Sequence, residues 1–315
     1  MKKFLAIILV VILALTAVAC GSKGGKLMFT TGGEQGTYYG FGTVLAGKIS
    51  DKTKTTVTAI VGKGSKGNIE VMGRGDAQLG LVQSDVAAYA YQGTRLFEKA
   101  DTSFSTVAAL YMEQVQIVTL DPNIKTVADL KGKSVSIGEP GSGVYFNAID
   151  VLEAYGLSES DINATLQGFG DSVESLQDGK IDAAFVVAGA PTTAVTSLSA
   201  TKQVYLVSLD DEHINKLVAE SPYYSKNVIA KDVYSTPEDV TTVAVGAVIV
   251  ARDDVSEDDI YNFISSIYNN IDSIKEAHAK GAELDLQFAA SYEAVPYHKG
   301  AAKYFTEKGI TVKTK

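Results

Sequence analysis

A pattern of short apolar strand, glycine-rich turn and helix occurs in two separate series along this chain of 315 residues. In the first series, predicted strands at 27–30, 55–61 and 77–82 alternate with helices near 39–52 and 68–75. In the second series, predicted strands at 134–137, 165–168, 183–187 and 204–208 alternate with helices near 144–155, 172–178 and 192–199. Strands that are separated by helices indicate an α/β fold built on parallel strands.

The segments between and after the two series predict two crossings. Predicted strands at 106–111 and 115–120 are separated by Met112-Glu113-Gln114, and a strand at 242–250 alternates valine and alanine around Gly246. Amphipathic helices at 257–279 then complete the first series. We therefore expect two lobes rather than one continuous sheet. Lobe 1 is predicted at 26–114 plus 243–315, and lobe 2 at 115–242.

Ligands of open α/β sheets bind beyond the carboxyl ends of the strands, so the turns of two facing lobes are expected to share a cleft.

The N-terminus has the features of a bacterial secretion signal. Lys2 and Lys3 precede an apolar run at 4–15, and small residues lead to Cys20, the only cysteine. We predict a signal peptide at 1–19. The position of Cys20 resembles the lipobox of bacterial lipoproteins, which predicts lipidation of Cys20 and a flexible tether at 20–25; the alternative is a plain cleaved signal with an incidental cysteine. Either way the protein is expected to be extracytoplasmic, anchored to the cell membrane or periplasmic.

The charge balance argues against a nucleic-acid partner. The formal net charge is −9, and removal of Lys2 and Lys3 with the signal peptide makes it −11 for the exported part. The three histidines are far apart and lack the spacing of metal ligands. We predict neither a metal site nor a cofactor.

The stretch at 134–148 is a candidate anion site, because a strand runs into a turn with Gly141 and Gly143 and then into a helix. Such a helix N-terminus presents free N–H groups and the positive end of the helix dipole. The alternative is an ordinary turn in which Ser142 caps its own helix.

Three other functions have some support in the sequence. Ser142 lies between two glycines, so an exported serine hydrolase is the main alternative, although no Gly-x-Ser-x-Gly elbow is present. The stretch 62–67 spells Gly-x-Gly-x-x-Gly after a strand, as in dinucleotide-binding proteins, but an exported protein meets no nicotinamide pool. A surface adhesin is the third class.

Several motifs resemble, in order, those of the TAXI-type solute-binding proteins that serve TRAP transporters. The matching segments are Thr31-Gly32-Gly33 with Gly36-Thr37-Tyr38-Tyr39, Gly67-Asn68, Gln83-Ser84-Asp85-Val86, Glu113, Leu130-Lys131-Gly132-Lys133, Gly138-Glu139-Pro140-Gly141-Ser142-Gly143, Asp178-Gly179-Lys180-Ile181-Asp182-Ala183-Ala184-Phe185, Gly189-Ala190-Pro191-Thr192 and Val295-Pro296-Tyr297-His298-Lys299-Gly300-Ala301. The resemblance covers about 26–309.

This resemblance implies an α/β, two-lobed periplasmic-binding-protein fold of the second type, with the ligand in the interlobe cleft. It implies a receptor rather than an enzyme. The expected cargo is a small carboxylate or acidic amino acid, glutamate-like or a dicarboxylate, and the expected partners are the membrane permease subunits of a sodium-driven TRAP transporter.

None of the three arginines lies in a motif turn, so an arginine clamp on the ligand is not expected. We predict instead that the Ser142 hydroxyl and the N–H groups of Gly143 and Val144 receive a carboxylate. Tyr38 or Tyr39, Gln83 and Ser84 would contact the ligand from lobe 1, and Glu113 would accept from an ammonium or hydroxyl group. The complete predicted set of ligand-binding residues is Tyr38, Tyr39, Gln83, Ser84, Glu113, Gly141, Ser142, Gly143, Val144, Val187, Ala188, Gly189 and Ala190.

Overall fold

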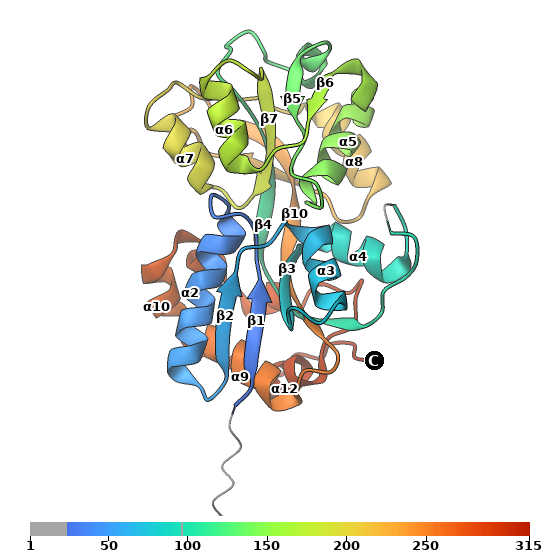
Figure 1. Ribbon diagram of the computed structural model, residues 1–315, viewed down its shortest axis with the longest axis vertical. Helices are drawn as coiled ribbons and strands as arrows, with labels where there is room; N and C mark the ends of the chain where they lie inside the picture. The colour runs from blue at the N-terminus through green and yellow to red at the C-terminus, as the bar shows by residue number, and fades with distance from the viewer. Residues whose placement is uncertain (1–23, 96) are drawn as a thin grey trace, which may run out of the picture.

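The computed structural model describes residues 24–95 and 97–315. The predicted signal peptide, Cys20 and most of the predicted tether lie outside the described residues. Figure 1 shows a lower lobe that contains both ends of the described chain and an upper lobe built from its middle. Two long strands, β4 (Phe104–Thr119) and β10 (Val240–Arg252), run through both lobes. Within the described part of the chain, no helix is long and apolar enough to cross a membrane.

The lower lobe is built on three parallel strands, β1 (Lys26–Thr30), β2 (Thr56–Ile60) and β3 (Leu79–Gln83), in the order β2-β1-β3. Helices α2 (Thr37–Lys52) and α3 (Ser65–Gly73) make the two crossovers, as the sequence predicts. The remaining helices of this lobe are α4 (Ser84–Gln92), α9 (Glu257–Asn269), α10 (Ile271–Ala277), α11 (Leu286–Ala289) and α12 (Lys299–Glu307).

The upper lobe repeats this arrangement with β5 (Ser134–Ser136), β6 (Asn163–Thr165) and β7 (Ala183–Ala188), which are parallel in the order β7-β5-β6. Helices α5 (Val144–Ala154) and α6 (Phe169–Gln177) follow β5 and β6, as expected. The other elements are α7 (Thr193–Ser199), β8 (Tyr205–Leu206), α8 (Asp211–Glu220) and β9 (Ser225–Ile229).

The prediction of two strands separated by 112–114 is wrong, because β4 is one continuous strand of 16 residues. Its residues Met112, Glu113 and Gln114 pair with Gly246, Val245 and Ala244 of antiparallel β10. The ladder therefore holds these residues extended despite their polar side chains. The strands of both lobes consequently belong to one ten-stranded hydrogen-bonded sheet, which corrects the expectation that no sheet would be continuous. Strand β10 is buried on both faces, as its valine and alanine pattern predicts.

Apolar residues of β4 and β10 pack with the lower lobe at one end of each strand and with the upper lobe at the other end. Leu110 and Tyr111 pack with the lower-lobe helices, whereas Val115 and Ile117 pack with the upper-lobe elements. On β10, the change falls between Val245 and Ala247. The predicted lobe boundaries at 114/115 and 242/243 fall inside the two strands.

Helix α4 is the main element that the sequence pattern misses, since Gln83-Ser84-Asp85 reads as the end of a strand. Residues from Ser84 to Ala90 are all buried, so the helix shows no alternation of apolar and polar faces. Helix α8 and strand β9 also escape prediction.

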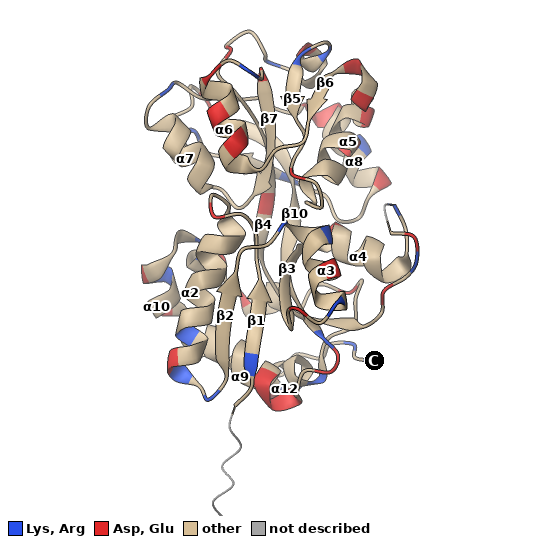
Figure 2. Ribbon diagram, viewed as in Figure 1, with Lys and Arg blue, Asp and Glu red and all other residues tan. Residues whose placement is uncertain are grey.

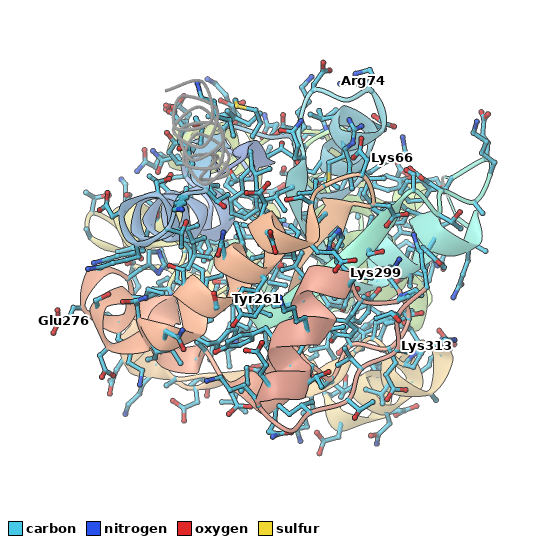
Figure 3. The ribbon with its side chains drawn as sticks, turned by 90° about the horizontal axis from the view of Figure 1, so that it is seen from below. Lys66, Arg74, Tyr261, Glu276, Lys299 and Lys313 are labelled. Carbon is cyan, nitrogen blue, oxygen red and sulfur yellow. The ribbon has the colours of Figure 1, made fainter. Side chains whose placement is uncertain are left out.

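The base of the lower lobe is covered by α9 and α12, which lie side by side in Figure 3. Tyr261 of α9 lies over this pair, and its hydroxyl donates to Glu307 at 2.7 Å. The side chains of Arg74, Glu276 and Lys313 point outward near the edge of this view. Figure 2 shows acidic residues on α5 and α6 of the upper lobe, in keeping with the negative net charge.

Replacement of Phe29 by alanine tests the core of the lower lobe. Phe29 is fully buried in β1, and its ring meets Phe263 of α9 edge to face at 5.8 Å between centroids. The cavity left by Phe29→Ala is expected to lower the free energy of unfolding by about 3–5 kcal/mol. Chemical denaturation measures this loss. Val228→Ala, at an exposed position of β9, is the control and should change the free energy by less than about 0.5 kcal/mol; equal effects would contradict the packing described.

Candidate functional site

A cleft of about 340 Å³ lies between the two lobes. Its lower wall comes from the turn after β1, the turn before α3, the end of β3 and the middle of β4. Its upper wall comes from the turns before α5 and α6 and from the end of β7. The lining residues are Gly32, Gly33, Glu34, Gln35, Gly36, Thr37, Tyr38, Val61, Lys63, Gly64, Ser65, Gln83, Glu113, Glu139, Ser142, Gly143, Val144, Gly168, Phe169, Gly170, Asp171, Val187 and Ala188.

The inner end of the cleft is formed by polar side chains from the lower lobe. Glu113 and Gln83 are each 2% exposed and Tyr38 is 9% exposed. Glu113 Oε1, Gln83 Oε1 and the Tyr38 hydroxyl are buried without a hydrogen-bond partner. Buried polar atoms are nearly always paired in folded proteins, so this cluster marks the inner end as unusual.

Burial is the main influence on ionisation at this end. It raises the pKa of Glu113 well above the usual range, and nearby Asp85 adds to the shift. Tyr38, Gln83 and Lys280 act in the opposite direction by favouring the carboxylate. Burial also raises the pKa of Tyr38, with Glu113 as the second cause. Burial thus favours the neutral acid at Glu113.

The upper wall contains the turn predicted as an anion site. Helix α5 begins after Gly143, and no side chain caps its N-terminus. The alternative in which Ser142 caps its own helix is therefore wrong: a Cβ on Gly138 would lie 2.8 Å from Ser142 Oγ, so the hydroxyl turns back towards its own loop. Ser142 Oγ is buried without a partner. Gly138 and Gly141 have φ of 97° and 89°, which glycine adopts without strain.

The two lobes touch around the cleft. The N–H of Gly67 donates to the carbonyl of Gly141 at 2.9 Å, and Thr37 Oγ1 donates to the carbonyl of Gly189 at 2.7 Å. The N–H of Ala194 donates to the carbonyl of Gln35 at 3.1 Å. These bonds join lower-lobe turns directly to upper-lobe turns, so the structure is a closed arrangement.

A second contact between the lobes lies beside the cleft, at Asp85 of α4. Asn147 of α5 donates to Asp85 Oδ2 at 3.0 Å and to the hydroxyl of Tyr224 at 2.8 Å. Burial raises the pKa of Asp85 to about 7, although the hydrogen bonds to Val86 and Asn147 oppose the shift. Arg95 extends this contact through an ion pair with Asp150.

Eight of the predicted ligand-binding residues line the cleft: Tyr38, Gln83, Glu113, Ser142, Gly143, Val144, Val187 and Ala188. They come from both lobes, and the structure brings them together around one space.

The other five predicted residues do not line the cleft. Tyr39 follows Tyr38 on α2, where the next side chain points to a different face. Ser84 supports the hinge, since its hydroxyl accepts from the N–H of Gly246 at 3.0 Å. The carbonyls of Gly141 and Gly189 are occupied by the bonds between lobes described above. The N–H of Ala190 donates to Gln114 Oε1 at 2.9 Å.

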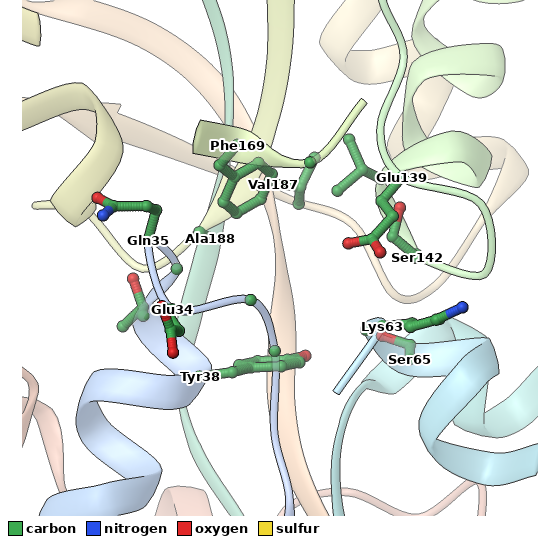
Figure 4. A pocket seen from close by; sticks show the side chains of 18 of the residues that line it. Glu34, Gln35, Tyr38, Lys63, Ser65, Glu139, Ser142, Phe169, Val187 and Ala188 are labelled. Atoms are coloured by element: carbon green, nitrogen blue, oxygen red, sulfur yellow. The ribbon is translucent and has the colours of Figure 1, made fainter. Parts of the chain in front are cut away.

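Sequence reasoning missed several charged and aromatic lining residues, namely Glu34, Lys63, Glu139, Phe169 and Asp171. Figure 4 shows Lys63 below Glu139, and Phe169 above the Glu34 loop. Each lies in or next to a glycine-rich turn between a strand and a helix. These residues could have been predicted from the sequence if every glycine-rich turn between a strand and a helix had been assigned to the cleft.

The lining is acidic. It contains four carboxyl groups, from Glu34, Glu113, Glu139 and Asp171, and one cation, Lys63. Burial raises the pKa of Glu139; Lys63 lowers it, and Asp171 raises it further.

The structure adds no support to the alternative chemistries. None of the three histidines is hydrogen-bonded to Ser142: His213 binds Asp210, His298 binds the carbonyl of Val255 and caps α12, and the Nδ1 of His278 accepts from Lys280. In the dinucleotide-like stretch, the N–H of Gly67 is already bonded to Gly141. Among residues 24–95 and 97–315, no group of three or more possible metal ligands is found.

The comparison with protein families decides the relationship. The model of the NMT1-like family matches residues 29–309, which is most of the chain. The chain belongs to the NMT1-like family.

Solved structures show which fold this NMT1-like chain has. The alkanesulfonate-binding protein SsuA from Xanthomonas axonopodis pv. citri bound to MOPS matches with a TM-score of 0.52 at 13% identity, covering 91% of this chain and 92% of that one. A putative L-cystine ABC transporter from Listeria monocytogenes matches at 0.53 and 16%, covering 83% and 98%. The GluR0 ligand-binding core from Nostoc punctiforme in complex with L-glutamate matches at 0.50 and 15%, covering 82% and 99%. The predicted two-lobed periplasmic-binding-protein fold is confirmed.

Replacement of Gly143 by alanine tests the closed arrangement. A Cβ at this position would lie 1.6 Å from Gln83 Oε1 and 3.1 Å from Ser65 Oγ, both in the other lobe. Such crowding is expected to cost the closed form about 1–3 kcal/mol. Small-angle X-ray scattering should therefore give a larger radius of gyration for Gly143→Ala than for the unaltered protein.

The matched control is Gly47→Ala on α2, where nothing lies within 4 Å of the new Cβ. Its radius should equal that of the unaltered protein. If Gly143→Ala and Gly47→Ala scatter alike, Gly143 is not a point of contact between the lobes.

Proposed function

We propose that this protein is an extracytoplasmic receptor that captures a small organic acid or amino acid in the cleft between its lobes. The observation that carries the proposal is the group of buried, unpartnered polar atoms around one cleft. Tyr38, Gln83 and Glu113 supply them from the lower lobe, and Ser142 supplies one from the upper lobe.

These atoms explain why a ligand would bind tightly. A buried polar group without a partner costs about 1–3 kcal/mol, so a ligand that pairs several such groups recovers a substantial free energy. The cleft has room for a solute of amino-acid size, with Phe169, Val144 and Val187 as apolar walls.

A carboxylate of the solute has a defined place at the N-terminus of α5. No side chain caps this helix, Gly143 and Val144 line the cleft, and Lys63 lies across from them. A helix N-terminus stabilises an anion by about 0.3–1 kcal/mol at exposed sites and by up to ~2 kcal/mol in partly buried ones. Without an arginine in the lining, these groups are the available partners for a negative charge.

Binding and closure would be coupled because the polar groups come from both lobes. A solute contacts the full set only in the closed form and so shifts the population towards it. The closed receptor would then deliver the solute to a membrane permease. We propose the TRAP type, on the resemblance of the sequence motifs to TAXI-type receptors, and lipidation at Cys20 would hold the receptor near the permease.

Isothermal titration calorimetry with Ser142→Ala and Glu113→Ala tests the site. Against a panel of carboxylates and amino acids, each variant should bind the preferred solute at least about fivefold more weakly, since each loses a hydrogen bond worth about 1 kcal/mol or more. Glu220→Ala, at the exposed end of α8, is the control. Unchanged affinity in both site variants would contradict the proposal that Ser142 and Glu113 bind the solute.

The transporter type has a separate test. Uptake of the solute by cells that carry the receptor and its permease is expected to need a sodium gradient. Collapse of that gradient with a sodium ionophore should abolish uptake while ATP is maintained. Uptake that instead follows ATP and ignores sodium would assign the receptor to an ABC transporter.

A further inference from the structure

We propose that the solute carries an N–H donor group, in the first place a primary ammonium, which binds Glu113 and Gln83 at the inner end of the cleft. We further propose that its total charge is zero or positive. This inference rests on the proposed receptor function and narrows its cargo: a zwitterionic or cationic amino acid fits, whereas a dicarboxylate does not.

The inner end of the cleft is rich in acceptors. Glu113 Oε1 and Gln83 Oε1 are buried acceptor atoms without a hydrogen-bond partner. Glu113 lies midway along β4 and Gln83 ends β3, with β10 between the two strands. The side chains of Gln83 and Tyr38 are close enough to Glu113 to favour its carboxylate. A second carboxylate would set its lone pairs against those of Gln83 and of an ionised Glu113, and it could bind only while Glu113 is the neutral acid. An ammonium group, with three hydrogens to donate, can serve both acceptors and the Tyr38 oxygen together.

The charged groups around Glu113 indicate that the ligand supplies the positive charge that pairs with it. Lys280 is the nearest cation that favours ionised Glu113, but it lies behind Tyr111, with its ammonium 5.4 Å above that ring. Its Nζ donates to Glu283 Oε1 at 2.5 Å, and Lys280 does not line the cleft. The other groups that face Glu113 are Asp85, which adds negative charge, and the neutral Tyr38 and Tyr111.

The outer part of the cleft excludes a second negative charge on the solute. Glu34, Glu139 and Asp171 line it from both lobes, against Lys63 alone. One carboxylate can be held by Lys63 and the N-terminus of α5. A further carboxylate would meet like charges, which disfavour binding.

The ionisation of Glu113 makes the two kinds of ligand distinguishable. Burial favours the neutral acid. An ammonium binds the carboxylate form, so binding releases a proton and the affinity rises with pH until Glu113 is ionised without the ligand. A carboxylate at the same place needs the neutral acid, so its affinity falls as the pH rises.

The test is calorimetry with four probes of similar size: glutarate, L-glutamate, L-glutamine and L-ornithine. We expect L-glutamine and L-ornithine to bind at least about tenfold more tightly than glutarate. The affinity of L-glutamate should lie between that of glutarate and that of the other two amino acids. Titrations in two buffers of different ionisation enthalpy should show proton release on binding of the amines. Glutarate binding as tightly as L-glutamine, or proton uptake with the amines, would overturn the inference while leaving the receptor function in place.

If none of the four probes binds and a wide panel of carboxylates, amines and amino acids gives no thermal shift, the receptor function itself fails and this inference with it. Binding from that panel of only those solutes that lack an N–H donor overturns the inference alone.

Two conservative variants refine the test. Glu113→Gln should weaken L-glutamine binding at least about tenfold and remove its proton release, because the charged acceptor is lost. Glu139→Gln with Asp171→Asn should strengthen glutarate binding several-fold. Glu220→Gln, outside the cleft, is the matched control for charge. An unaltered ratio of glutarate to L-glutamine affinity in the rim variant would contradict the role of the acidic rim.

Discussion

The antiparallel pairing of β4 with β10 is the constraint on which both lobes depend. Each strand contributes to the core of the lower lobe at one end and to that of the upper lobe at the other. Between these ends Glu113 pairs with Val245 of β10. The Glu113 side chain belongs to neither apolar cluster. Pairing with β10 holds the backbone of β4 extended there, so a polar residue can face the cleft without interrupting the strand. The same two strands thus connect the lobes and place the inner end of the site.

Closure relies on the backbone at positions where glycine allows close approach. The carbonyls of Gly141 and Gly189 accept bonds from the lower lobe, and Gly143 lies directly against Gln83. Side chains at these positions would hold the lobes apart. The glycine-rich turns that resemble nucleotide- or anion-binding motifs in the sequence therefore serve two purposes: they leave the N-terminus of α5 open, and they let the opposite lobe reach it.

Much of the fold could be predicted because strand, turn and helix follow one another with clear periodicity. The failures have physical causes. Helix α4 is buried on all sides and so lacks an amphipathic pattern, and the polar Glu113 and Gln114 disguise the continuity of β4. At the site, the turn around Ser142 was recognisable from its glycines. Lys63, Glu139, Phe169 and Asp171 were not assigned, because charge and aromaticity in a turn do not reveal which way a side chain faces until the lobes are brought together.

The buried carboxyl groups of Asp85 and Glu113, near the hinge, differ in what they gain when the lobes close. Both have a pKa raised by burial, and each keeps one oxygen without a partner. Asp85, however, receives a hydrogen bond from Asn147 of the other lobe when the lobes meet. Glu113 receives no such bond from the upper lobe, and the uncharged side chains that favour its carboxylate, those of Tyr38 and Gln83, belong to the lower lobe. Closure therefore brings a donor of the upper lobe to one oxygen of Asp85, whereas it brings none to Glu113. A closed lobe pair that still lacks this donor gains most from a solute that brings one.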